Sequence, residues 1–119
     1  MEPLSQFNRD INEMKADTLS RYGKRLEEAE RMLEAEKNFN QRQHAILSRM
    51  KKEMEGRIKR KKRKTYECLI ERIQKKLSKS TQKIMELEKL KKKYMDEYKT
   101  QREHLNLTDH SFIDSYYNK

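Results

Sequence analysis

The sequence predicts an all-α protein: a long, nearly continuous helix that forms an oligomeric coiled coil or helical bundle, with a short aromatic C-terminal tail. Of its 119 residues, 42% are charged and only 33% are hydrophobic, with no Trp, which is too little apolar material for a compact core. The chain has only two Gly and one Pro, so it lacks the residues on which tight turns depend. Apolar residues recur at steps of three and four, the spacing of one helix face.

The long helix is predicted over residues 1–106. Pro3 suits its first turn, where the missing N–H has no helical partner. Asn106, Thr108 and Asp109 supply polar side chains that can end the helix. A turn within the polar stretch Asn38–His44 would give a two-helix hairpin instead, but this stretch has neither Gly nor Pro, so we favour the continuous helix.

The apolar stripe predicts a seam that needs a partner helix. Long helices gain most of their stability by burying an apolar face, so we expect a partner, most simply another copy in a dimer or tetramer. The residue types leave strand number and orientation open. Steps of four from Ile46 to Ile58 predict a straighter rod there. The predicted seam residues are Leu19, Tyr22, Leu26, Leu33, Ile46, Met50, Met54, Ile58, Ile70, Ile73, Leu77, Ile84, Leu87 and Tyr94.

Residues 107–119 form an aromatic tail with a lower charge density. Its apolar residues are Phe112, Ile113, Tyr116 and Tyr117. This pattern is typical of a short terminal helix that folds onto the bundle, or of a contact for other coiled-coil proteins. A partly ordered terminus is equally compatible with it.

The positive charge is concentrated near the middle of the chain. The formal net charge is +10, and seven of the eight residues from Arg57 to Lys64 are Lys or Arg. On a continuous helix these side chains would surround the rod as a basic collar over residues 57–64. Between Glu55 and Glu67 the sequence has no acidic residue that could offset them. The predicted contact residues are Arg57, Lys59, Arg60, Lys61, Lys62, Arg63 and Lys64, flanked by Lys51 and Lys52.

Such a cluster predicts a polyanionic partner. We favour DNA, bound without sequence preference and organised or tethered by the rod, because released counterions would supply most of the affinity. No zinc-finger spacing, helix-turn-helix signature or RNA-recognition motif is present. RNA and an acidic protein surface remain alternatives. In a further alternative, the protein is a coiled-coil scaffold whose basic cluster serves only for nuclear import; either way we expect a nuclear protein.

Other chemistry is not expected. His44, His104 and His110 are scattered and Cys68 has no second thiol, so the sequence offers neither a metal site nor an intrachain disulfide. No phosphate-cradling glycine loop or nucleophile motif is present, so we expect neither a cofactor nor enzymatic activity. No apolar run is long enough to cross a bilayer, and we expect no membrane partner.

Two short segments resemble a known family. "FNRDIN" (Phe7–Asn12) and "KRLE" (Lys24–Glu27) resemble the start of the helical core in synaptonemal-complex lateral-element proteins of the meiotic chromosome axis. The resemblance implies an antiparallel helical tetramer that binds DNA and joins end to end, through its terminal residues, into fibres.

Overall fold

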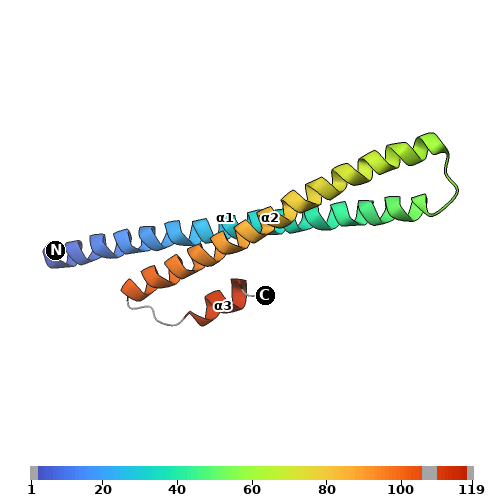
Figure 1. Cartoon of the computed structure of the whole chain (residues 1–119). Helices are drawn as coiled ribbons and strands as arrows, with labels where there is room; N and C mark the ends of the chain where they lie inside the picture. The colour runs from blue at the N-terminus through green and yellow to red at the C-terminus, as the bar shows by residue number, and fades with distance from the viewer. Residues whose placement is uncertain (1–2, 106–109, 118–119) are drawn as a thin grey trace. The chain divides into compact units, whose positions relative to one another are not determined.

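A computed structural model describes residues 3–105 and 110–117, and it confirms the all-α class. Its helices are α1 (Pro3–Met54), α2 (Arg60–His104) and α3 (Ser111–Tyr117), shown in Figure 1. The described residues contain no strand. The predicted stop signals at Asn106, Thr108 and Asp109, and the side chain of Phe112, lie outside the described residues.

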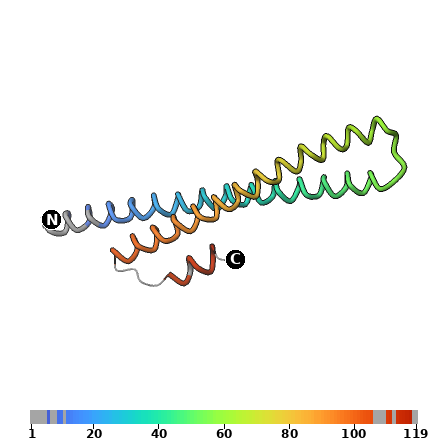
Figure 2. Tube along the Cα trace, viewed as in Figure 1, coloured from blue at the N-terminus to red at the C-terminus, as the bar shows by residue number. Residues whose placement is uncertain are grey.

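The single helix predicted over residues 1–106 is wrong in one respect, because the chain leaves the helix between Met54 and Arg60. The trace in Figure 2 reverses direction there, so the chain forms a hairpin after all, but not at Asn38–His44, which is helical. The last turn of α1 closes with hydrogen bonds from the Glu55 N–H to the Lys51 and Lys52 carbonyls, both at 3.3 Å. Gly56 follows, a residue that costs a helix interior about 1 kcal/mol relative to Ala. The cations that follow it would also repel one another around a continuous helix.

The chain divides into two compact units. The first, here called the tip unit, contains residues 32–88, and the second, the tail unit, contains residues 1–31 and 89–119. In the tip unit the end of α1 and the start of α2 run antiparallel on either side of the turn (Figure 1). The tail unit contains the start of α1, the end of α2 and the whole of α3.

A heptad seam closes the tip unit. On α1, buried or half-buried residues alternate at steps of three and four, namely Leu33, Glu36, Asn40, Gln43, Leu47, Met50 and Met54. On α2 the same spacing gives Tyr66, Ile70, Ile73, Leu77, Ser80, Ile84 and Leu87. Leu47, Ile73 and Leu77 form the buried core, with Ile46, Met50 and Ile70 packed against it. This alternation is that of a left-handed coiled coil, so the run of four-residue steps through Ile46 does not describe the seam.

Polar residues inside this seam fix how the two helices align. The Asn40 amide donates a hydrogen bond to the Ser80 hydroxyl at 3.1 Å, and Ser80 is 2% exposed. At the edges, Lys83 pairs with Glu36 at 3.6 Å, and Lys37 approaches Glu88 at 4.0 Å. A sliding of one helix along the other would bury the Asn40 amide without its partner, which costs about 1–3 kcal/mol.

The tail unit has its own small core. Leu26, Met95 and Ile113 are buried together, and Tyr94, Tyr98 and Tyr117 pack against them. Beside this core, Lys91 pairs with Glu30 at 2.6 Å and donates a hydrogen bond to the Tyr117 carbonyl at 2.7 Å. The tail therefore folds back as a short helix, which is one of the alternatives that the sequence leaves open.

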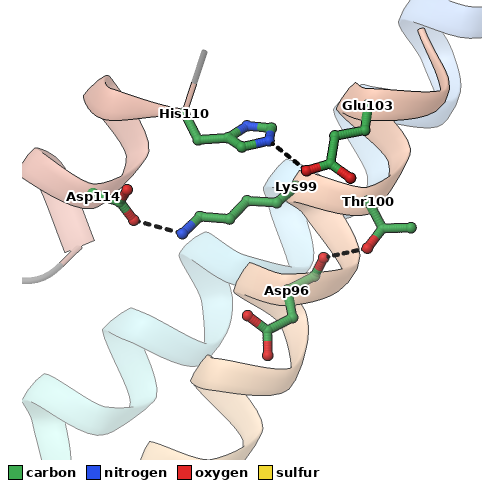
Figure 3. A network of polar contacts seen from close by, with 6 residues as sticks. All are labelled: Asp96, Lys99, Thr100, Glu103, His110 and Asp114. Atoms are coloured by element: carbon green, nitrogen blue, oxygen red, sulfur yellow. Dashed lines mark hydrogen bonds and ion pairs between the residues drawn. The ribbon is translucent and has the colours of Figure 1, made fainter. Parts of the chain in front are cut away.

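Polar contacts hold α3 along α2 (Figure 3). Lys99 of α2 pairs with Asp114 of α3, and the His110 ring lies 3.0 Å from the Glu103 carboxylate. The Thr100 hydroxyl donates a hydrogen bond to the Asp96 carbonyl, so this contact lies within α2 and does not connect α2 to α3. These contacts orient α3, while the fully buried Ile113 supplies the apolar anchor.

A cysteine pair placed at the polar layer tests the hairpin. In a Cys68→Ser background, Asn40→Cys with Ser80→Cys should form a disulfide within one chain, because the replaced side chains touch. Non-reducing gel electrophoresis should show a compact monomer that shifts on reduction. A covalent dimer as the main product would instead mean that two copies exchange arms.

Two leucines of α2 test where the stability lies. Leu77 is 7% exposed in the seam and Leu69 is 37% exposed outside it. Leu77→Ala should lower the free energy of unfolding by about 2–5 kcal/mol, because it leaves a cavity. Leu69→Ala, the matched control, should cost less than about 1 kcal/mol. Urea denaturation followed by circular dichroism measures both, and equal losses would contradict the assigned seam.

Candidate nucleic-acid interface

The predicted basic residues gather at the hairpin turn of the tip unit. Arg57 and Lys59 lie in the non-helical turn, and Arg60–Lys64 form the start of α2. Lys51 and Lys52 lie in the last turn of α1. All nine side chains are exposed. We call these nine residues the basic tip, which replaces the collar predicted around a continuous helix.

The two helix ends that meet here interact with positive charge in opposite ways, one favourably and one unfavourably. A helix C-terminus carries partial negative charge, so Lys51 and Lys52 are stabilised at the end of α1. A helix N-terminus carries partial positive charge, yet the first turn of α2 contains no acidic residue and several cations. The start of α2 is therefore an electrostatically unfavourable place for this sequence, and an external anion would relieve it.

Two of the cations also have contacts within the protein. The Arg63 guanidinium donates a hydrogen bond to the Met54 carbonyl at 3.4 Å, across the turn. The Lys62 ammonium lies 5.6 Å from the centre of the Tyr66 ring, within the range of a cation–π contact. Both the Arg63 and the Lys62 side chains remain exposed.

Tyr66 joins the two helices just below the tip. Its hydroxyl donates a hydrogen bond to the Glu53 carboxylate, and this bond raises the pKa of the phenol above its ordinary value. Glu53 is thus already engaged by the protein and offsets the nearby cations only in part.

The predicted seam residues pack within one chain. Leu26, Leu33, Ile73, Leu77 and Leu87 are buried. Half-buried are Leu19, Tyr22, Ile46, Met50, Met54, Ile70, Ile84 and Tyr94, and also Ile58, which lies in the turn. The second arm of the chain covers the seam, so the seam does not require another copy, and self-association stays a prediction.

Sequence reasoning missed Leu47 and the polar members of the seam. Glu36, Asn40 and Gln43 interrupt the apolar pattern, which hid the regular alternation that leads from Leu33 to Leu47. One signal could have revealed the hairpin: Asn40 and Ser80 lie equally far from residue 60, as do Leu47 and Ile73.

The predicted tail residues separate in the structure. Ile113 is fully buried, Tyr117 is half-buried and Tyr116 is 60% exposed. The tyrosine rings lie edge to face at 4.8 Å between their centres. Of the predicted tail residues whose side chains the structure describes, Tyr116 is the most exposed.

Metal clusters and membrane-spanning helices are absent from the part of the chain that the structure describes. Within residues 3–105 and 110–117, no three His, Cys, Asp or Glu side chains lie close enough together to hold a metal ion. None of the described helices carries an apolar stretch that could span a bilayer. Comparison of the chain with protein-family models, curated proteins and solved structures finds no match.

The titration of Tyr117 tests the docking of α3. Burial, assisted by the nearby Glu27, raises the pKa of Tyr117 from 10.0 to about 12. Because the folded state favours the neutral phenol, the stabilisation is complete below pH 10 and is lost as the pH rises toward 12. In a Tyr66→Phe background, which removes the other phenol with a raised pKa, tyrosinate absorbance should show a late-titrating group that Tyr117→Phe removes, whereas Tyr116→Phe should leave it. Loss of the late group in the Tyr116 variant alone would contradict the placement of α3.

Proposed function

We propose that the basic tip binds DNA without sequence preference and that the protein organises or tethers it. One observation carries this proposal: the nine exposed cations converge where α1 ends and α2 begins, with no carboxylate in the first turn of α2. The tip unit contains 17 Lys and Arg against 8 Asp and Glu, a formal charge of +9. Phosphate groups would supply the missing negative charge.

The chemistry of the tip favours phosphate backbone over bases. Arg and Lys side chains at a turn can each approach a different phosphate, and the released counterions make binding favourable and strongly dependent on salt. The N–H groups at the start of a helix also favour phosphate oxygens. Base reading would need side chains held in fixed geometry, and most of the cations here are exposed without a partner to orient them.

Tethering would require two tips, so the proposal includes self-association. The seam is covered within the chain, and another surface must therefore join the copies. In the tail unit, Met14 is 69% exposed and Tyr116 is 60% exposed, and such side chains favour contact with another copy. An arrangement like that of the meiotic chromosome axis remains a prediction.

A second function is favoured by the conformation of the turn. Arg57, Ile58 and Lys59 are non-helical, and a receptor that binds a short basic peptide needs such accessible backbone. The protein would then be a coiled-coil scaffold whose basic tip serves for nuclear import.

Neutral substitutions at the tip separate these functions. Lys59, Arg60 and Lys61 are suitable because no contact at the turn engages their side chains, unlike those of Lys62 and Arg63. Replacing all three by Gln should weaken binding to a short random duplex at least about tenfold at low salt. It should also flatten the dependence of log K on log salt by about 0.9 for each lost phosphate contact. Fluorescence anisotropy of labelled duplex measures both quantities.

Three lysines of the tail unit provide the matched control. Lys89, Lys92 and Lys93 are exposed on α2, and their conversion to Gln removes the same charge. Binding should then change little. Equal weakening in both triple variants would mean that net charge, not the tip, attracts DNA. No binding by the unaltered protein at low salt would leave the scaffold function.

A further inference from the structure

We infer that one flank of the tip unit is a docking surface for an acidic amphipathic helix of another protein. The inference is independent of the proposed DNA binding, because it concerns the side of the α1–α2 pair and not its turn. It starts from apolar residues of α1 that lie next to the seam and stay partly exposed; one of them, Ile46, also packs against the seam core.

Each of these residues comes one position before a seam residue of α1. Met32, Phe39 and Ile46 are spaced seven residues apart, so they lie along one line of α1, next to the seam residues Leu33, Asn40 and Leu47. Met32 is 46% exposed, and Phe39 and Ile46 are half-buried. On α2, Leu69 occupies the corresponding position and is 37% exposed. We call these four residues the Phe39 flank.

Contacts at the helix edges show which residues share this side. Lys83 of α2 pairs with Glu36 of the α1 seam, and Glu53 of α1 accepts a hydrogen bond from Tyr66 of the α2 seam. Like the Phe39 flank residues, Lys83 and Glu53 each come one position before a seam residue. The Lys37–Glu88 pair closes the opposite side. Next to the seam, that opposite flank carries Lys37, His44, Gln74 and Thr81; Met85 lies farther from the seam, one turn after Thr81. The tip unit thus has one polar flank and one partly apolar flank.

The charge around the Phe39 flank specifies its occupant. On α1, Arg42 and Arg49 border the apolar line, and on α2, Lys76 and Lys79 do so; all four are exposed. The carboxylates of Glu36 and Glu53 are already paired with Lys83 and Tyr66. Glu86 lies at the Met32 end, away from Arg42 and Arg49.

An apolar line between rows of cations fits a helix with an apolar stripe and acidic edges. The stripe would pack on Met32, Phe39 and Ile46, and the carboxylates would face the Arg and Lys rows. From Met32 to Ile46 the line is about 20 Å long, the length of two heptads. Nucleic acid fits this flank poorly, because the apolar side chains would lie against phosphates.

Designed peptides test the flank directly. One labelled helical peptide of about three heptads has Leu at its seam positions and Glu at the edge positions, and a second has Lys at those edges. Fluorescence anisotropy with the full chain should show binding of the Glu peptide, at least about tenfold tighter than that of the Lys peptide. Equal affinity for both peptides, or no binding of the Glu peptide, would overturn the proposal.

Two methionines with similar exposure give a matched pair of variants. Met32→Gln together with Phe39→Gln should weaken binding of the Glu peptide at least about tenfold, because its apolar stripe loses its contact. Met85, 50% exposed on the other side of the tip unit, provides the control, since Met85→Gln should leave binding unchanged. Circular dichroism should show that each variant keeps the helicity of the unaltered protein. Because Met32 is so exposed, Met32→Gln alone serves if the double variant fails to fold.

Two further outcomes distinguish the flank from the tip and from a contact between copies. The Lys59, Arg60 and Lys61 triple Gln variant should bind the Glu peptide as the unaltered protein does. If only this variant loses the peptide, the tip is the site and the proposal fails, whatever the result with DNA. If the Met32 and Phe39 variant instead abolishes self-association that the Glu peptide cannot displace, the flank belongs to a second copy and the proposed partner is wrong.

Discussion

The antiparallel burial of one heptad seam between α1 and α2 is the interaction on which the other features depend. Neither helix has an apolar face wide enough for a conventional core, and each gains its stability from the other. Because the partner is in the same chain, the association loses no translational freedom. Polar residues within the seam, above all Asn40 and Ser80, cost stability but restrict the alignment of the helices. That restriction fixes which residues reach the turn and which reach each flank.

Formation of the hairpin changes the meaning of the basic segment. On a continuous helix its cations would surround the backbone and repel one another in every direction. At the turn they project into solvent from the end of one helix and the start of another, and Arg63 and Lys62 contribute contacts to the fold. The remaining positive charge at the start of α2 opposes the helix dipole. A segment that is unfavourable for its own helix and accessible to large anions is well suited to phosphate binding.

The same seam also divides the surface of the tip unit into two unlike flanks. Residues next to the seam on one side are Met32, Phe39 and Ile46, and on the other side they are Lys37 and His44. In the tail unit, by contrast, α3 covers apolar surface beside the seam through Ile113 and its neighbours. The chain therefore covers apolar surface with its own tail in the tail unit, whereas in the tip unit Met32 stays 46% exposed and Leu69 37% exposed.

The sequence by itself determined the helical class, because scarce Gly and Pro, high charge and three-four apolar spacing are local properties. It also determined the members of the basic cluster and most of the apolar seam residues. Only the tertiary structure decided that the chain turns at Gly56 and that the nine cations therefore meet at a tip. It also decided that Leu47 is buried in the core, whereas Ile46, the predicted seam residue, packs against that core. The reason is that a seam of this spacing is satisfied equally by a second chain or by a second arm. The choice depends on the turn and on polar pairs such as Asn40 with Ser80, whose partners lie far apart in the sequence.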